Sequence, residues 1–521
     1  MNWRLYLLLT LLGLAVVAVM ASLQVSPGYM DADYYYAGGM QLVTGHGFTE
    51  PYIWNYLDNP AGLPHPSNVY WMPMASLVAA FSALILGSGN FSSARVGFLL
   101  IAAMLPPLTA ALAWSFTSRR DLSLASGLLA LFPAFYLVFL PTTDTFGLYM
   151  LFGGLFFLVL SRRASYLNPF ILGLLAGLMH LTRADGLLWL LIALFSVCYM
   201  SSKSSQGRKI KIYSSLLLTL GGYLLVMTPW FIRNYHIFRT PLAPGASKML
   251  WLTSYDQLFS YPASQITIAN WWASGLNAIL RVRTWALGLN LANALSVQWE
   301  VFLLPLIAVG LWHLRRDKRV HVAVLSWLIT LVVMTVAFPF AGARGGFFHS
   351  GAAIQTMWWV LATVGLERVI VWGKQKRGWD ITQAGRLFYS GLVILALLIS
   401  IVLVYTRVLG GGGNQPWDME QKAYSQINGF LTLHGMSAKD VVIVANPPGF
   451  YITTGNPAIA VPDGDIQTLI TVARKYEAKY VILEATSTPS SLMPVYLNPE
   501  NQSQLSYLGD VEGAHIYGIR P

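Results

Sequence analysis

Long apolar runs separated by short basic runs constrain this chain most. Hydrophobic residues make up 55% of its 521 residues and charged residues 11%, whereas soluble domains carry about 25% charged residues. A helix needs about 20 apolar residues to cross a membrane. Runs that fit lie at about 5–25, 94–117, 122–140, 145–161, 213–232, 297–314, 320–340, 351–373 and 387–406. The sequence therefore predicts a mainly α, polytopic transmembrane helical bundle.

The positive charge is placed as in a membrane protein. The formal net charge is +11, and the basic residues gather between the apolar runs. These clusters are Arg119-Arg120, Arg162-Arg163, Lys203 to Lys211, Arg315 to Arg319, and Lys374 to Arg377. Short basic loops of this kind mark the cytoplasmic side, so we expect membrane lipids and no nucleic acid as partners. The run Leu5 to Val25 exceeds the apolar core of a signal peptide, about 7–15 residues, and predicts an uncleaved first helix.

Charge also fixes the expected topology. Residues 168–200 lie between two basic clusters and must cross an even number of times, so we predict two short helices that turn near Thr182–Gly186. If Tyr70–Leu86 lies in the outer face without crossing, every basic cluster stays inside. This gives about eleven crossings of the cell (plasma) membrane, with a cytoplasmic N terminus. The outer regions are then a first loop (26–93), a tight turn ending at Asp144, and residues 233–296.

Composition changes beyond Arg407. The run Gly410 to Gly413 predicts a linker. Val441 to Ala445 and Tyr480 to Leu483 resemble short buried strands, with a helix at about 466–477 between them. We therefore expect a transmembrane module at 1–406 and a soluble, extracytoplasmic α/β domain at 407–521.

Three acids stand at the expected outer membrane face. Asp31 and Asp33 follow the first apolar run, and Asp144 lies in a turn too short to leave the membrane surface. Acids close to apolar spans are costly and often functional, and a carboxylate can take a proton from an attacking nucleophile. The alternatives are solvated loop acids for Asp31 and Asp33, and a helix-start role for Asp144.

Three outer arginines are candidate ligands of a donor phosphate: Arg183, Arg233 and Arg344. A guanidinium pairs with phosphate oxygens bidentately. The glycines around Arg344 would let backbone and guanidinium approach a phosphate together. Arg233 could instead snorkel at a helix end, and Arg183 could form a structural ion pair with Asp185.

Candidate contacts to the acceptor or the sugar are His65, Trp54, Tyr35 and His349. The alternative for such aromatic residues is an ordinary interfacial position. The histidines show no metal-ligand spacing, so the sequence predicts no metal ligands and no required cofactor. A divalent cation such as Mg²⁺ or Mn²⁺, held by Asp31 or Asp33 together with Asp144, remains compatible with the sequence.

The order of these motifs resembles the membrane glycosyltransferases of the C superfamily, above all glycosyltransferase family 39 with its protein O-mannosyltransferases and aminoarabinose transferases. The motifs are Asp31-Ala32-Asp33-Tyr34-Tyr35, Gly45-x-Gly47-Phe48, His65-Pro66, Tyr70-Trp71-x-Pro73, Thr143-Asp144-Thr145, Gly177 to Gly186, Pro229-Trp230-x-x-Arg233-Asn234-Tyr235, and Arg344 to Ser350. The resemblance covers about residues 1–405, and it lies in the order of motifs that are loose individually.

The resemblance implies inverting transfer of a sugar, a hexose or a pentose, from a polyprenyl-phosphate donor. The acceptor would be a protein, lipid or glycan on the extracytoplasmic side. By this likeness the first-loop acid is the catalytic base, and Asp144 lies across the same cavity. The family's acidic pair is Asp-Glu, whereas Ala32 takes the second position here and Asp33 follows. Either aspartate could be the base, and we favour Asp31 because it matches the leading acid.

A transporter or flippase of lipid-linked glycans is the alternative from another class. Many transporter folds are built from repeats, and none is apparent in this sequence. A flippase also needs polar groups along a path through the bilayer, whereas these acids and arginines gather on one face. An inactive scaffold whose C-terminal domain binds a partner is a third interpretation. Release of polyprenyl phosphate by the purified protein would distinguish the three.

Overall fold

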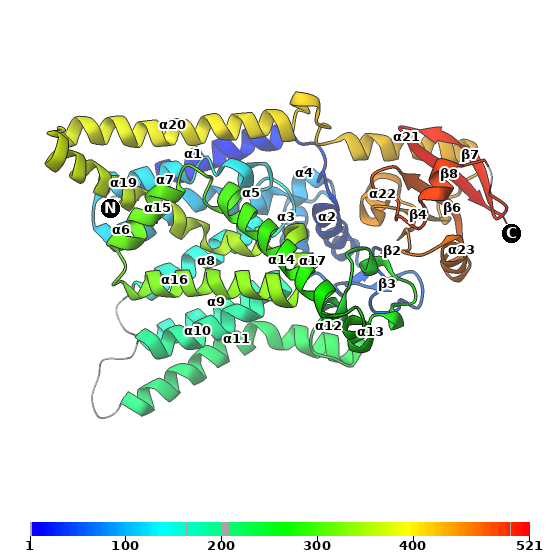
Figure 1. Ribbon diagram of the computed structural model, residues 1–521, viewed down its shortest axis with the longest axis horizontal. Helices are drawn as coiled ribbons and strands as arrows, with labels where there is room; N and C mark the ends of the chain where they lie inside the picture. The colour runs from blue at the N-terminus through cyan, green and yellow to red at the C-terminus, as the bar shows by residue number, and fades with distance from the viewer. Residues whose placement is uncertain (1–2, 163–164, 201–207, 501, 521) are drawn as a thin grey trace.

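The computed structural model describes residues 3–162, 165–200, 208–500 and 502–520, so parts of the basic clusters at 162–163 and 203–211 lie outside the described residues. The molecule has two parts along its long axis (Figure 1). A bundle of helices forms one end, and a smaller helix and sheet domain with the C terminus forms the other. The α2 helix (Met30–Val43) lies between them.

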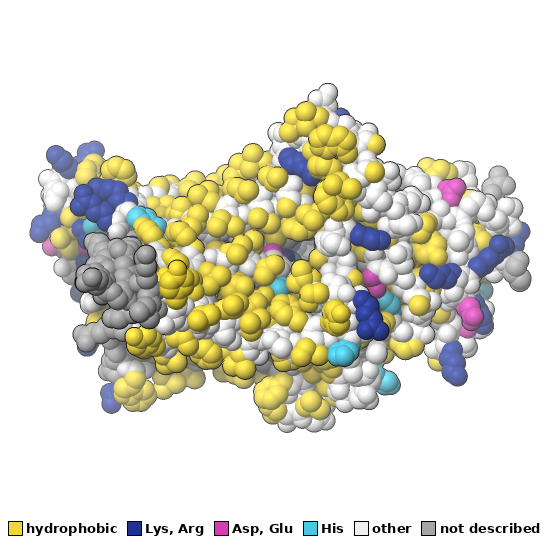
Figure 2. Space-filling view, turned by 90° about the horizontal axis from the view of Figure 1, so that it is seen from below, with side chains coloured by type: hydrophobic (Ala, Val, Ile, Leu, Met, Phe, Trp, Pro, Cys, Tyr) yellow, Lys and Arg dark blue, Asp and Glu magenta, His cyan; other side chains and the backbone are white. Residues whose placement is uncertain are grey.

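The bundle is the mainly helical membrane architecture that the sequence predicts. Its helices are α1 (Trp3–Ser22), α4 (Phe91–Ala94), α5 (Val96–Ala103), α6 (Leu105–Thr117), α7 (Arg120–Leu129), α8 (Phe146–Leu160), α9 (Leu167–Thr182), α10 (Leu187–Met200), α11 (Arg208–Phe238), α14 (Leu276–Asn293), α15 (Leu304–His313), α16 (Lys318–Val332), α17 (Pro339–Ala341), α18 (Phe347–Gly351), α19 (Gln355–Arg377) and α20 (Ile381–Arg407). Within the described ranges, six helical stretches are long and apolar enough to cross a membrane. Figure 2 shows a bundle face on which hydrophobic side chains predominate, with basic side chains at its left end and over the right half of the molecule.

Glycines let the helices of the bundle approach closely. A Cβ on Gly365 of α19 would lie 1.9 Å from the carbonyl oxygen of Leu306, and one on Gly310 of α15 would lie 2.1 Å from that of Leu361. The α9 and α11 helices meet in the same way, at Gly173. Small residues at such contacts are the usual basis of helix packing in membranes.

Two segments bear on the expected topology. The Tyr70–Leu86 run forms α3 (Met74–Leu86), whose 13 residues rise only about 20 Å, less than the roughly 30 Å of a hydrocarbon core. The region 233–296, expected to be an outer loop, contains α12 (Pro244–Lys248), α13 (Ile268–Ala273) and the 18-residue helix α14. Arg281 and Arg283 interrupt the apolar pattern of α14, and for this reason the sequence does not reveal it as a helix.

The acidic segment of the first loop is helical. Asp31 and Asp33 lie in the first turn of α2, where the helix dipole favours negative charge. Small residues then pack α2 onto α3: a Cβ on Gly39 would lie 2.8 Å from the Cβ of Ala79. The rest of the first loop holds the two-residue strands β1 (Thr49–Glu50), β2 (Tyr52–Ile53) and β3 (His65–Pro66).

The C-terminal domain contains the strands and the helix expected from the sequence. Its elements are α21 (Met419–Leu433), β4 (Val441–Val444), α22 (Pro447–Thr454), β5 (Ala458–Ala460), α23 (Ile466–Lys475), β6 (Ala478–Glu484), α24 (Met493–Leu497), β7 (Leu505–Val511) and β8 (Ala514–Ile519). The sheet order is β2-β5-β4-β6-β8-β7. The first four strands are parallel, and the β6–β8 and β8–β7 pairs are antiparallel.

The edge strand β2 comes from the first loop, not from the C-terminal domain. Tyr52 and Ile53 pair in parallel with Ala458 and Ile459 of β5. Nearby, the Tyr56 hydroxyl donates to the carbonyl oxygen of Ala460 at 2.5 Å. The first loop and the C-terminal domain therefore share one sheet, across the boundary that composition places at residue 406.

Candidate active site

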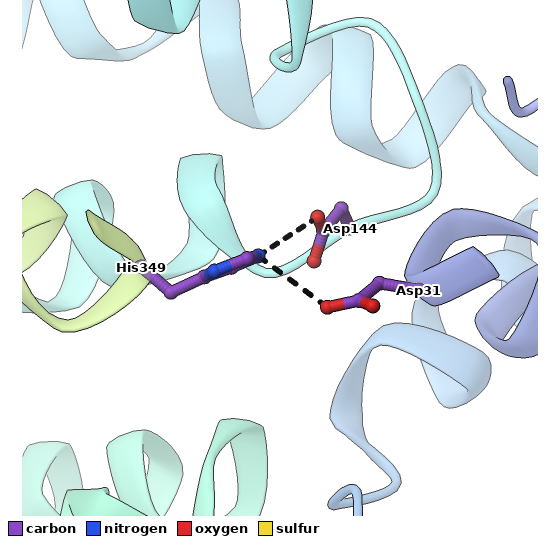
Figure 3. A group of neighbouring side chains, drawn as sticks. All are labelled: Asp31, Asp144 and His349. Atoms are coloured by element: carbon purple, nitrogen blue, oxygen red, sulfur yellow. Dashed lines mark hydrogen bonds and ion pairs between the residues drawn. The ribbon is translucent and has the colours of Figure 1, made fainter. Parts of the chain in front are cut away.

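The side chains of Asp31, Asp144 and His349 point toward one another (Figure 3), and α2, the helix that carries Asp31, lies between the bundle and the C-terminal domain (Figure 1). Asp31 comes from the first turn of α2, Asp144 from the turn before α8, and His349 from α18. The Nε2 atom of His349 lies 3.1 Å from Asp144 Oδ2 and 3.7 Å from Asp31 Oδ2. Segments more than 200 residues apart in the sequence thus form one acidic cluster.

Asp144 is held rigidly. Its Oδ2 accepts a hydrogen bond from the Tyr29 hydroxyl at 2.5 Å, and its Oδ1 accepts one from the Thr145 amide at 2.5 Å. Burial alone would raise the pKa of this carboxyl, but His349 and these hydrogen bonds hold the pKa below its usual value. The Thr143 hydroxyl donates to the Ala32 carbonyl at 2.7 Å, which ties the turn to α2.

Asp31 is the accessible acid of the pair. Its side chain is 28% exposed, whereas that of Asp144 is 0% exposed. Burial raises the pKa of Asp31 to about 6, His349 and Arg183 oppose this rise, and Asp144 adds to it. A carboxylate with a pKa close to neutrality can both take and release a proton, as general base catalysis requires.

His349 presents one nitrogen to both acids. Its Nδ1 donates to the Gly345 carbonyl at 2.9 Å, and its ring stacks on Phe146 with 4.0 Å between centroids. A histidine whose other nitrogen is anchored on a carbonyl is the usual arrangement of a metal ligand. Two carboxylates and one imidazole suit a divalent cation, so Asp31, Asp144 and His349 can hold a metal ion. The spacing of histidines along the sequence does not predict this set of possible metal ligands.

Arg183 and Asp185 form an ion pair at 2.9 Å. This is the alternative to phosphate binding that the sequence leaves open for Arg183. Asp185 Oδ2 also accepts from the Ser350 hydroxyl at 2.7 Å and from the Tyr149 hydroxyl at 3.3 Å. Because Ser350 follows His349, this network connects the turn between α9 and α10 to the acidic cluster.

Arg344 is exposed, five residues before His349. Its guanidinium lies 4.6 Å from the ring centre of Tyr255. Gly345 has φ +122°, a conformation that residues with a Cβ rarely adopt, and the helix kinks there. The charges of Arg344 and of Asp31 both act on the Tyr255 hydroxyl, so Tyr255 lies between this exposed cation and the acidic cluster.

Tyr35 also lies near the cluster. Burial raises its pKa well above the usual value, and the charge of Asp144 raises it further, while Arg183 acts in the opposite direction. Tyr29 and Tyr255 are additional neighbours that the sequence motifs do not single out. The one sequence signal for Tyr29 is its place two residues before Asp31.

The structure does not bring Asp33 into the cluster. Its Oδ2 accepts a hydrogen bond from Asn446 Nδ2 of the C-terminal domain at 2.8 Å, and the residue is 4% exposed. Burial and nearby Glu420 raise the pKa of Asp33 well above its usual value. Asp31 and Asp33, separated only by Ala32, therefore face different surroundings.

Three other predicted residues contact the first loop itself. Arg233 donates to the carbonyl oxygens of Ser67 at 2.8 Å and Phe48 at 3.3 Å. His65 lies 2.8 Å from Asp58 and 3.4 Å from Glu50 in a buried ion-pair group. Trp54 stacks on Trp71 with 4.0 Å between ring centres. These contacts hold the loop together.

Solved structures share this architecture, and they show that the chain has the same fold as ArnT and an archaeal oligosaccharyltransferase. ArnT from Cupriavidus metallidurans bound to undecaprenyl phosphate matches with a TM-score of 0.59 at 11% identity, over 98% of this chain and 97% of that one. The oligosaccharyltransferase of Archaeoglobus fulgidus, in its apo form, matches with a TM-score of 0.54 at 12% identity, over 91% of this chain and 69% of that one. No family model and no curated protein matches the sequence.

Proposed function

We propose that this protein is an inverting glycosyltransferase that moves a sugar from a polyprenyl-phosphate donor to an acceptor on the extracytoplasmic face of the cell membrane. The observation that carries the proposal is the acidic cluster, in which a partly exposed Asp31 lies beside a buried, hydrogen-bonded Asp144. Asp31 is in the first turn of α2, which lies between the apolar bundle and the C-terminal domain, so a lipid-anchored donor could keep its tail in the bilayer while its sugar reaches the acids.

Asp31 is proposed as the base. It accepts the proton of the acceptor nucleophile as that atom attacks the anomeric carbon from the side opposite the phosphate, which inverts the configuration. A phosphate leaving group needs no protonation, so one carboxylate suffices where glycoside hydrolysis uses two. Asp144 fixes the orientation of His349, and Arg344 binds the phosphate as negative charge develops on it.

The donor class rests on the fold and on one solved neighbour, because ArnT was crystallised with undecaprenyl phosphate. One neighbour was crystallised with a tethered acceptor peptide. The acidic cluster of this chain contains no group that selects one acceptor class, so the proposal covers protein, lipid and glycan acceptors. The same holds for hexose and pentose donors, mannose included.

A divalent cation is compatible with the cluster. The Archaeoglobus fulgidus oligosaccharyltransferase has also been crystallised with Zn and sulfate. Here Asp31, Asp144 and the Nε2 of His349 would be the ligands. When bound, such a cation would neutralise charge on a donor phosphate. The guanidinium of the exposed Arg344 would neutralise the same phosphate charge without a metal ion.

Release of polyprenyl phosphate tests the proposal. The protein is purified into lipid nanodiscs and incubated with polyprenyl-phosphate sugars extracted from the source membranes. We expect free polyprenyl phosphate to appear only with wild-type protein and acceptor. A deletion strain that accumulates one lipid-linked sugar would identify the donor. Movement of intact lipid-linked sugar between leaflets, without release, would instead support a flippase.

A further inference from the structure

We propose that the C-terminal domain positions the helix that carries the catalytic acid, and that Asn446 is a positioning residue that acts through Asp33. The catalytic part of this inference rests on the proposed function, whereas the structural part stands on contacts between α2 and the domain. The inference gives roles to Asp33 and to the C-terminal domain, neither of which the acidic cluster requires.

The segment before α2 is hydrogen-bonded to, and packed against, the start of the C-terminal domain. Asp418 Oδ1 accepts hydrogen bonds from the Ser26 amide at 2.9 Å and from the Ser26 hydroxyl at 2.6 Å. The indole nitrogen of Trp417 donates to the Ser26 carbonyl at 3.1 Å. Gly28 packs so closely on Trp417 that a Cβ there would overlap the indole ring. The chain therefore enters α2 along a surface made by the domain.

Asn446 holds the first turn of α2. Its Nδ2 donates to Asp33 Oδ2 at 2.8 Å and to Glu420 Oε2 at 3.1 Å. Its Oδ1 accepts from the Gly449 amide at 3.0 Å and caps α22. Asp33 and Asn446 are 4% and 3% exposed, so water is poorly placed to replace this bond. Without the amide, two buried carboxylates would face each other unbridged.

Helix geometry transmits this contact to the acidic cluster. Residues two apart on an α-helix point about 200° apart around its axis. Asp31 therefore faces His349 and Asp144 while Asp33 faces the domain from the other side of the same turn. A rotation of α2 about its axis moves both side chains together, so the bond from Asn446 fixes the direction of Asp31.

Other links hold α2 at positions farther from the acid. Near the end of the helix, Gln41 Nε2 donates to the Tyr451 hydroxyl at 2.9 Å. Beyond the helix, β2 joins the sheet of the domain through β5. These contacts keep the domain docked when the Asn446 bond is removed, which makes the role of Asn446 separable from docking itself.

The test compares variants of the full chain in nanodiscs by hydrogen–deuterium exchange of the amides at residues 33–36. In Asn446→Ala we expect exchange about tenfold faster, the size of loss expected when a buried carboxyl group is left without its hydrogen-bond partner. The double variant Asp33→Asn with Asn446→Asp restores one donor and one acceptor between these two positions and keeps the α22 cap. It also places a carboxyl group against Glu420, so exchange should return part of the way toward wild type.

Asn456→Ala is the matched control. Asn456 is as buried as Asn446, at 4%, but its Nδ2 donates to Ser437 and Asp440 inside the domain. It should destabilise the domain without faster exchange in α2. In the transfer assay, Asn446→Ala should lower kcat with little change in KM for the donor, and the double variant should recover part of kcat.

The outcomes separate the two proposals. Unchanged exchange in Asn446→Ala, or equal acceleration by Asn456→Ala, would overturn the positioning role. Faster exchange in Asn446→Ala that the double variant reverses, in preparations that transfer no sugar at all, would support the positioning role while the proposed function fails.

Discussion

Two aspartates separated by one alanine have different chemistry here because their surroundings differ. Asp31 is 28% exposed and faces a histidine, whereas Asp33 is 4% exposed and accepts a hydrogen bond from Asn446. The motif alone does not show which aspartate is the catalytic base, because the sequence does not reveal the conformation of this segment and therefore does not distinguish the surroundings of residues 31 and 33. Only the helix and its two neighbours distinguish them, and they favour Asp31.

We expect Asp31→Asn to lower turnover by about 10²–10⁴-fold, the usual contribution of a general base, without loss of folded protein. The measurement is release of polyprenyl phosphate beside a thermal unfolding curve of each variant. Asp33→Asn should retain measurable turnover. If Asp33→Asn is inactive and Asp31→Asn is active, the base is Asp33. If both variants are fully active, neither aspartate is the base and the proposed site is wrong.

Turnover should also depend on pH through Asp31. The pKa of this group is raised to about 6, and a base must be deprotonated to act. Activity should therefore be full near pH 7.5 and fall through pH 6, by about tenfold per pH unit well below that value. A pH–rate profile of kcat/KM measures this, because kcat/KM reports the titrating groups of the free enzyme. A profile that stays flat down to pH 5 would exclude Asp31 as the titrating base.

Arg344→Ala should lower turnover strongly, because a hydrogen bond between charged partners contributes about 1.5–3 kcal/mol. Arg344→Lys should recover only part of it, since lysine lacks the bidentate fork. Both variants are assayed with and without chelator. Wild-type activity that vanishes with chelator and returns with Mg²⁺ or Mn²⁺, while Arg344→Ala remains near normal, would assign the phosphate to a metal instead.

At the scale of elements, apolar length and basic loops predict most of the helices. They fail where the pattern is mixed. The helix α14 contains Arg281 and Arg283, and Arg283 packs on the Trp271 ring of α13 at 5.3 Å, a contact between two helices that a pattern of apolar residues does not predict. The α2 helix was expected as loop because its first turn is polar, yet its glycines fit against α3. Tertiary contacts thus decide both elements.

The contact between α15 and α19 should be sensitive to side-chain size. A Cβ on Gly365 would lie 1.9 Å from the Leu306 carbonyl, so Gly365→Leu must push the helices apart, at a cost of at least about 1–3 kcal/mol. We expect a lower unfolding temperature in detergent. Gly391→Leu on α20, where nothing lies within 4 Å, is the matched control. Equal stability of the two variants would show that this packing contributes little.

For the molecule as a whole, composition predicts a membrane bundle and a separate C-terminal domain, and motif order predicts the fold family. Neither predicts that the first loop and the domain share a sheet. The strand β2 has two residues, too few for any alternating pattern. Likewise, His349 joins Asp144 across 205 residues, and such pairings arise only from the folded helices.

We predict eleven crossings with α3 on the outer side. The Tyr36 hydroxyl on α2 donates to the Gly89 carbonyl at 2.9 Å, which places Gly89 on the same side as the acidic cluster. In a Cys198→Ala background, Gly89→Cys and Asn414→Cys should react with an impermeant thiol reagent on intact cells. Arg316→Cys should react only after permeabilisation. Protection of Gly89→Cys in intact cells would mean that α3 crosses.

The shared sheet also sets an order of events during synthesis. Tyr56 in the first loop bonds to Ala460, 404 residues later. At roughly 5–20 residues per second of elongation, the loop with Asp31 waits on the order of 20–80 s before its partner strand exists. A nascent chain therefore holds α2 only by its contacts with the bundle until translation is nearly complete, and any truncation before β5 leaves α2 permanently without the shared sheet.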